Sequence, residues 1–373
     1  MSRPWSRTAR ALLAFLLLVL AASPAFAVLA QRTFVSGTSI ANDANPCSLA
    51  LPCRSFGAAI AQTISGGEVI VLDSAGYGPV TITQSVSIIA PAGVYAGISV
   101  ISPTNLVGVS VNAAGIKVLL QNLVINALGG NYGIFLQQGA ELYVNNCTVA
   151  NFTSAGIYSI AGGSKLYLKD TVVRDAGPGA YGLWLFGTAV ADAERVRIES
   201  NGSDGVRAEG GASVSIKRSV LARNAGSGLI AAAAAGSVAR ATVEDSLISD
   251  NGSDGLTASS SGAGAVVEIS AARNTITRNA ENGVGALASS SGSSVANLSD
   301  NLLTQQGLDG VAATGAGAVV TASRNTFAGN ATSALHTFTG GTIHSVKGAD
   351  ALPNNAGEQT TSTIGNVVPA NAF

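Results

Sequence analysis

The sequence predicts an all-β solenoid, and three observations indicate this fold. A Gly followed by an aliphatic residue returns every 23 to 28 residues between Gly133 and Gly310. Between these positions apolar and polar residues alternate with period two, as at 142–144 and 166–168, and helical spacing is absent. The alternating segments are rich in Val, Ile and Thr, which favour strands. Self-similarity at this period is the signature of a solenoid, in which each repeat forms one coil.

The first 27 residues have the pattern of a secretory signal peptide. Arg3, Arg7 and Arg10 precede an apolar core at 11–22, and a small-x-small cleavage site follows at 25–27. The apolar core is too short to span a membrane, and no later stretch is long enough. We therefore expect an exported mature chain without a membrane span, located in the periplasm, on the cell surface or in the medium.

Composition excludes some classes of function. The formal net charge of the whole chain is −1, so a strongly basic nucleic-acid-binding surface is not expected. Cys47 and Cys53 lie close enough in sequence for a disulfide in an oxidising compartment. Cys147 falls in an inward column of small residues, so we expect a buried thiol.

Each coil carries an inward apolar column seven residues before the repeated Gly. Three residues after this column stands an Asn, which suits a tight left-handed turn and can form an amide ladder from coil to coil. Three residues before the column, charges of opposite sign recur along the chain. Coils of a parallel solenoid stack about 4.8 Å apart, so opposite charges in one column would pair and fix the register. The charged positions are Asp170, Arg195, Arg218, Asp245, Arg273, Asp300 and Arg324.

The amino-terminal part of the mature chain resembles the opening of a family of secreted bacterial β-helix proteins. The family has no assigned activity and falls in the pectate-lyase-like superfamily. The segments that carry the resemblance are 32–37, 42–47, 52–56, 66–72 and 77–82. The resemblance implies a right-handed parallel β-helix of about 12 coils. We expect a signal peptide at 1–27, an amino-terminal cap at 28–66, the β-helix at 67–341, and a last coil with a cap at 342–373. In the cap, Ser55 would begin a short helix with Phe56, Ile60 and Ile64 on one face, plugging the open end.

A catalytic site on this fold would need carboxylates on neighbouring coils. Asp204 and Asp254 are the best candidates, although they fall two coils apart, or about 10 Å, at the outer limit for an inverting pair. Asp-Gly turn chemistry explains the same residues without catalysis. His336 and His344 are the two histidines, and no further ligands accompany them, so no metal or cofactor is expected.

Aromatic residues gather between 132 and 186, where Tyr143, Tyr167 and Trp184 are candidates for binding sugar rings. Simple stacking between strands explains them slightly better than sugar binding does. Two functions remain open. The first is an exported, non-catalytic scaffold that binds glycans or surface partners along its stacked faces. The alternative is a polysaccharide-active enzyme, either a lyase or a glycoside hydrolase. The lack of a convergent acid–base cluster in the sequence favours the scaffold.

Overall fold

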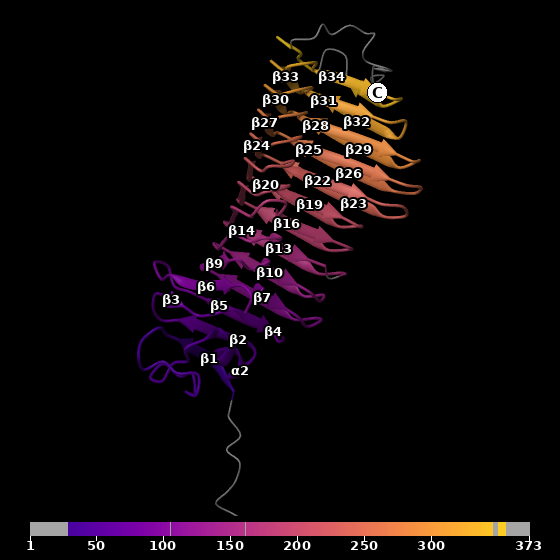
Figure 1. Ribbon diagram of the computed structural model, residues 1–373. Coiled ribbons are helices and arrows are strands. Elements are labelled where there is room, and N and C mark those ends of the chain that lie inside the picture. The colour runs from indigo at the N-terminus through magenta and orange to yellow at the C-terminus, as the bar shows by residue number, and fades with distance from the viewer. Residues whose placement is uncertain (1–28, 105, 161, 346–349, 356–373) are drawn as a thin grey trace, which may run out of the picture.

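The computed structural model describes residues 29–104, 106–160, 162–345 and 350–355. The described chain forms a parallel β-solenoid in which each coil contributes one strand to each of three sheets (Figure 1). We name the 13-stranded sheet A, and the two 11-stranded sheets B and C. The predicted all-β solenoid is confirmed, with about 11 three-stranded coils instead of the expected 12.

Sheet A holds the strands that begin each coil. In spatial order they are β1 (Ala30–Val35), β2 (Thr63–Val71), β5 (Val86–Ile89), β8 (Lys117–Gln121), β11 (Glu141–Asn145), β14 (Lys165–Lys169), β17 (Val190–Glu194), β20 (Ser213–Lys217), β23 (Val238–Glu244), β26 (Val266–Ala272), β29 (Ser293–Ser299), β32 (Ala318–Ser323) and β35 (Thr342–Ser345).

Sheet B follows sheet A after a tight corner. Its strands are β3 (Ala75–Gly76), β6 (Ala96–Ile101), β9 (Leu123–Leu128), β12 (Thr148–Ala150), β15 (Val172–Arg174), β18 (Arg197–Glu199), β21 (Val220–Ala222), β24 (Leu247–Ser249), β27 (Thr275–Thr277), β30 (Leu302–Thr304) and β33 (Thr326–Ala328).

Sheet C completes each coil before the chain returns to sheet A. Its strands are β4 (Val80–Ile82), β7 (Val107–Val111), β10 (Tyr132–Leu136), β13 (Ala155–Ser159), β16 (Tyr181–Phe186), β19 (Val206–Glu209), β22 (Leu229–Ala233), β25 (Leu256–Ser261), β28 (Val284–Ser289), β31 (Val311–Thr314) and β34 (Leu335–Phe338).

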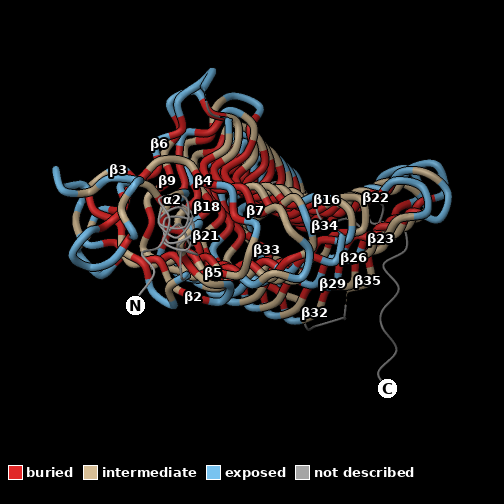
Figure 2. Tube along the Cα trace, turned by 90° about the horizontal axis from the view of Figure 1, so that it is seen from below, coloured by how far each residue is buried: buried red, intermediate tan, exposed pale blue. Residues whose placement is uncertain are grey.

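The core is the interior of the coil, where one apolar side chain from each sheet meets the others. Ile125 of sheet B, Ile134 of sheet C and Leu142 of sheet A are all fully buried. Viewed along the solenoid, buried residues line the inside of the coils and exposed residues lie mainly in the projecting turns (Figure 2). Period-two alternation therefore becomes an inside and an outside for each sheet.

The corners correct one detail of the sequence interpretation. The prediction that the corner Asn is left-handed is wrong, because the residue before the Asn adopts the positive φ. Arg223 (φ 55°) precedes Asn224 in this way, and Asp250 (φ 58°) precedes Asn251. The Asn side chains are instead buried in the predicted amide ladder, where Asn224 Nδ2 donates to Asn251 Oδ1 at 3.0 Å. The left-handed residue turns its side chain outward, which explains why these corner positions are so often charged.

The charge column also lies at left-handed corners, between sheets A and B. Arg195 pairs with Asp170 at 2.7 Å, and Arg273 pairs with Asp245 at the same distance. Arg218 departs from the simple pattern because it pairs with Glu194 in the adjacent column. The predicted coil register is therefore confirmed. All these pairs are exposed, so each contributes little to stability and serves mainly to disfavour slipped registers.

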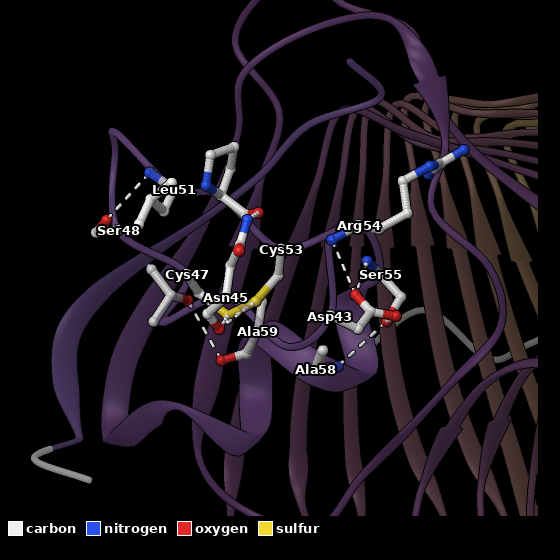
Figure 3. The surroundings of a disulfide bond; sticks show 12 residues. Asp43, Asn45, Cys47, Ser48, Leu51, Cys53, Arg54, Ser55, Ala58 and Ala59 are labelled. Atoms are coloured by element: carbon white, nitrogen blue, oxygen red, sulfur yellow. Dashed lines mark hydrogen bonds between the residues drawn. A yellow bond between two sulfur atoms is a disulfide. The ribbon is translucent and has the colours of Figure 1, made fainter. Parts of the chain in front are cut away.

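At the amino-terminal end of the solenoid, the short helix α2 (Phe56–Ala61) packs against β1, β2 and β4 (Figure 1). The Ser55 side chain caps it by accepting from the Ala58 amide, as predicted, and Phe56 is fully buried. Ile64 was expected on the helix but lies in β2, because the helix ends earlier. The Cys47–Cys53 disulfide is present beside the cap (Figure 3).

Asp43 fixes the start of α2 from the same loop. One of its carboxylate oxygens accepts the backbone amides of Arg54 and Ser55, each at 2.8 Å, and the other accepts the Ser55 hydroxyl (Figure 3). The third cysteine, Cys147, is buried and free, as expected. No helix in the described part of the chain is long and apolar enough to cross a membrane.

At the carboxyl end, β34 completes the last three-stranded coil and β35 begins a further one, in which Ala351 bridges back to Thr326. The expected cap at 342–373 falls partly outside the described residues, and the expected signal peptide lies wholly outside them.

Candidate functional site

The outer face of sheet C carries a continuous row of aromatic side chains. Strand pairing places Phe135, Tyr158 and Trp184 opposite one another on three successive coils. The rings of Phe135 and Tyr158 stack at 5.2 Å, and those of Tyr158 and Trp184 at 4.3 Å. We call these three residues the aromatic row.

Two further tyrosines widen the aromatic row on the side where each strand begins. The ring of Tyr132 lies 5.2 Å from that of Tyr158, and the ring of Tyr181 lies 5.1 Å from that of Trp184. All five rings are half-buried, so part of each remains exposed. The result is a broad aromatic platform on one side of the solenoid.

The repeated Gly lies at the inner side of this face. A Cβ on Gly205 would stand 2.6 Å from Asn224 Nδ2 and 2.7 Å from the Gly228 carbonyl oxygen. A side chain there would therefore push neighbouring coils apart and displace the amide ladder. This close approach explains why the repeat is marked by Gly.

The next position after the aromatic row is a cation held between two carboxylates. Arg207 pairs with Trp184 across the sheet. Its Nε donates to Glu209 Oε2 at 2.8 Å, and its Nη1 donates to Asp204 Oδ2 at 3.2 Å. We call Asp204, Arg207 and Glu209 the carboxylate–arginine cluster.

Trp184 and Tyr181 join the aromatic platform to this cluster. The Trp184 indole Nε1 donates to Glu209 Oε1 at 2.8 Å. The Arg207 guanidinium lies 5.5 Å from the centre of the Tyr181 ring, which is within the range of a cation–π contact. Aromatic surface and ionisable groups therefore form one connected face.

The two carboxylates of the cluster have different surroundings. Asp204 is buried, and this burial raises its pKa, while the Ser227 amide and Arg207 act against the rise. Glu209 is more exposed and accepts from both Arg207 and Trp184. Two carboxyl groups whose surroundings differ in this way can serve as a general acid and a general base.

A surface depression of about 390 Å³ opens beside the cluster. Arg207, Glu209 and Phe186 form part of its lining, and the small residues Ala232 and Ser259 of the following coils form another part. The change from large aromatic to small side chains along sheet C produces this hollow. It gives a ligand room to reach Glu209.

Asp254, the second predicted carboxylate, has a structural setting. Its Oδ1 accepts the amide and the side chain of Asn282, each at 3.0 Å, and its Oδ2 accepts the Thr257 hydroxyl at 2.9 Å. Ser227 separates it from Asp204, since the Ser227 amide donates to Asp204 Oδ1. Both acids thus belong to a hydrogen-bonded column, but only Asp204 also contacts a cation.

The two histidines lie on different sheets. His336 is in β34 of sheet C, where its Nδ1 lies 3.0 Å from Asp309 Oδ2, and His344 is in β35 of sheet A. Among the described residues, no three His, Cys, Asp or Glu side chains are grouped to hold a metal ion.

The three predicted sugar-binding residues do not share a face. Tyr143 and Tyr167 stack at 4.7 Å on sheet A, whereas Trp184 lies on sheet C. The sequence interpretation also missed Arg207 and Glu209. Their spacing of two residues in a strand was the available signal, because it places both side chains on one face.

The comparisons with known proteins agree with this architecture. The sequence model of the family described as "Right handed beta helix region" matches residues 107–270 and 156–332. No curated protein matches the chain significantly in sequence.

Three solved structures illustrate the likeness in fold. Pectate lyase Pel9A is 13% identical, with 90% of this chain and 81% of that one covered and a TM-score of 0.53. The periplasmic alginate epimerase AlgG is 15% identical, with 78% and 74% covered and a TM-score of 0.55. A rhamnogalacturonan lyase is 11% identical, with 88% of both chains covered and a TM-score of 0.51. At these identities the likeness concerns the fold alone.

Proposed function

The chain belongs to the right-handed β-helix family, and we propose that it is a polysaccharide-active enzyme that binds a neutral glycan along sheet C and hydrolyses it. The observation that carries this proposal is the link from the aromatic row through Trp184 to Glu209, Arg207 and Asp204. The fold of polysaccharide lyases and of an alginate epimerase supports the class of substrate. This reading reverses the preference for a non-catalytic scaffold, which rested on the apparent lack of an acid–base cluster.

Charge favours a neutral glycan over an acidic one. The described face of sheet C carries four acids, namely Asp204, Glu209, Asp254 and Asp309, whereas Arg207 already pairs with two of them. Arg207 is the single Lys or Arg in the described strands of sheet C, so an acidic polysaccharide would find no unpaired lysine or arginine along them. β-Elimination would also need a cation free to neutralise a uronate carboxylate, and Arg207 is engaged. Aromatic faces, by contrast, pack well against the apolar side of neutral pyranose rings.

Geometry allows hydrolysis by a pair of carboxyl groups. Asp204 and Glu209 hydrogen-bond to the same guanidinium, so their carboxyl oxygens are separated by no more than on the order of 8 Å. Retaining glycosidases hold their two carboxyl groups about 5–5.5 Å apart and inverting ones about 6.5–9.5 Å apart, so this bound is compatible with both; we propose the inverting roles. In the proposed roles Asp204 protonates the leaving oxygen, Glu209 activates the water, and Arg207 positions both carboxyl groups.

The proposed acid has a consequence for pH. Burial raises the pKa of Asp204, so its carboxyl keeps its proton to higher pH than an ordinary aspartic acid. The protonated form is the active one in this role. Hydrolysis should therefore decline as pH rises through the pKa of Asp204.

A direct test combines two product assays on soluble neutral glycans such as xyloglucan, galactomannan and hydroxyethyl cellulose. We expect reducing ends to appear without the ultraviolet absorbance of an unsaturated sugar. Asp204→Asn should lower kcat about 10²- to 10⁴-fold. Asp250→Asn is the matched control, because Asp250 is an exposed corner residue on another face.

The outcomes separate the functions. Unsaturated products from polygalacturonate or alginate would show a lyase and contradict the proposed hydrolysis. Glycan binding that needs Trp184 but yields no product with any glycan would favour the non-catalytic scaffold. We further propose export for this chain, supported by the disulfide and by the signal-like pattern at 1–27.

A further inference from the structure

Sheet A carries a second, separate hollow. It has a volume of about 450 Å³, and Tyr167, Asp192 and Ser215 on three successive coils lie across it. The pairing of β14, β17 and β20 places these three residues in one outward column. Sheet A is a different wall of the solenoid from sheet C, so this hollow is not part of the site described above.

The hollow exists because side-chain size falls abruptly along the column. Tyr143 and Tyr167 stack with ring centres 4.7 Å apart and planes 12° from parallel. The next two positions are the much smaller Asp192 and Ser215. One face of the Tyr167 ring packs on Tyr143, and the other borders the hollow, where no ring of the next coil covers it.

Charges around the hollow balance. Lys169 and Lys217 face Asp192 and Glu194 along its lining. Lys217 and Glu194 already form ion pairs with other residues. Among the described residues, Lys169 acts on Asp170 and Glu194 through longer-range electrostatics and is not in a direct ion pair, and Asp192 is likewise outside the direct ion pairs. The site thus offers one ammonium donor and one carboxylate acceptor beside an open aromatic face, with no net charge.

We propose that this hollow is an accessory binding site for a sugar residue of a neutral polysaccharide. The ring of Tyr167 would pack against the apolar face of the pyranose, while Asp192 and Lys169 would bond its hydroxyls. Sugar hydroxyls both donate and accept hydrogen bonds, so a neutral sugar can satisfy the Lys169 donor and the Asp192 acceptor together. An anionic ligand would be repelled by Asp192. The inference needs no catalysis, and it goes beyond the proposed function because it adds a second site on another face.

The site would tether a glycan strand while another part of the strand, or another strand, lies on sheet C. A second contact on a linked ligand raises overall affinity even when each contact is weak. A glycan long enough to contact both sites should therefore bind more tightly than a short oligosaccharide that contacts one site, and this gain should be lost when either site is removed.

The test is calorimetric titration with short xyloglucan, galactomannan and cello-oligosaccharides, each too short to reach both faces. We compare the natural protein with Tyr167→Ala, Trp184→Ala and the double variant. Two sites are expected for the natural protein, one for each single variant and none for the double. Tyr167→Phe keeps the ring and should keep the site, and Tyr95→Ala, an exposed tyrosine elsewhere, is the control.

The titrations distinguish a failure of the accessory site from a failure of the proposed function. One site that is lost with Trp184→Ala and unaffected by Tyr167→Ala overturns the accessory site and leaves the proposed function standing. One site that is lost with Tyr167→Ala and unaffected by Trp184→Ala supports the accessory site and overturns the proposed role of sheet C. Asp192→Asn should weaken the sheet A site about tenfold; unchanged affinity there would remove the carboxylate from the proposal.

Discussion

Replacing Asn251 by Ala should destabilise the solenoid more than almost any other polar substitution, because this side chain joins three coils. Its Oδ1 accepts the backbone amide of Asn224 at 3.1 Å and the Asn224 Nδ2 at 3.0 Å. Its own Nδ2 donates to Asn279 Oδ1 at 2.9 Å and to the Leu221 carbonyl at 3.1 Å. Asn224, Asn251 and Asn279 are each about 1% exposed, so water cannot replace these bonds.

The magnitude follows from the groups left without partners. The buried Asn224 amide loses its acceptor, and one unsatisfied buried donor costs about 1–3 kcal/mol. The partial losses at Asn224 Nδ2, Asn279 and Leu221 add to this. We expect a total destabilisation of about 3–5 kcal/mol, at the upper end for single substitutions.

Urea unfolding followed by far-ultraviolet circular dichroism measures this difference, provided that the m-value is unchanged between variants. Gln138→Ala is the matched control. Gln138 also gives one amide hydrogen bond to a neighbouring coil, to Asn112 at 2.9 Å, but it is exposed. Its loss should change stability by no more than about 0.5 kcal/mol. If Asn251→Ala costs no more than this control, buried amide stacking does not stabilise the fold and the reasoning is wrong.

Three further predictions concern charge and thiol chemistry. Burial raises the pKa of Asp254, so the wild-type protein loses stability as pH rises from below the ordinary aspartate pKa through this higher value. Asp254→Asn should therefore unfold at a higher urea concentration than the wild type at pH 7. Equal urea midpoints of the two proteins at both pH 7 and pH 3 would contradict this. Asp245→Arg should lower the urea midpoint, and Arg273→Asp should partly restore it; additive effects in that double-mutant cycle would mean that the charges do not interact. Burial raises the pKa of Cys147 to about 12, so a thiol reagent should label it only after unfolding, and rapid labelling of the native protein would refute its burial.

The sequence alone determined most of the coil. In a parallel solenoid each residue contacts its equivalent one repeat away, so spacing along the chain reports contacts in space. For this reason the inward column, the amide ladder and the alternation of Asp170 and Arg195 could all be predicted before the structure. The disulfide of Cys47 and the helix cap at Ser55 are short-range features that spacing and capping chemistry also predict.

The tertiary structure decided which outward residues share a face. A single left-handed residue such as Arg223 turns the chain at each tight corner, and these corners divide the outward residues of one coil among three sheets. Tyr143 and Trp184 consequently lie on different sheets although both are outward aromatics. The contact of Arg207 and Glu209 with Trp184 of the preceding coil depends on strand pairing, which only the folded structure shows.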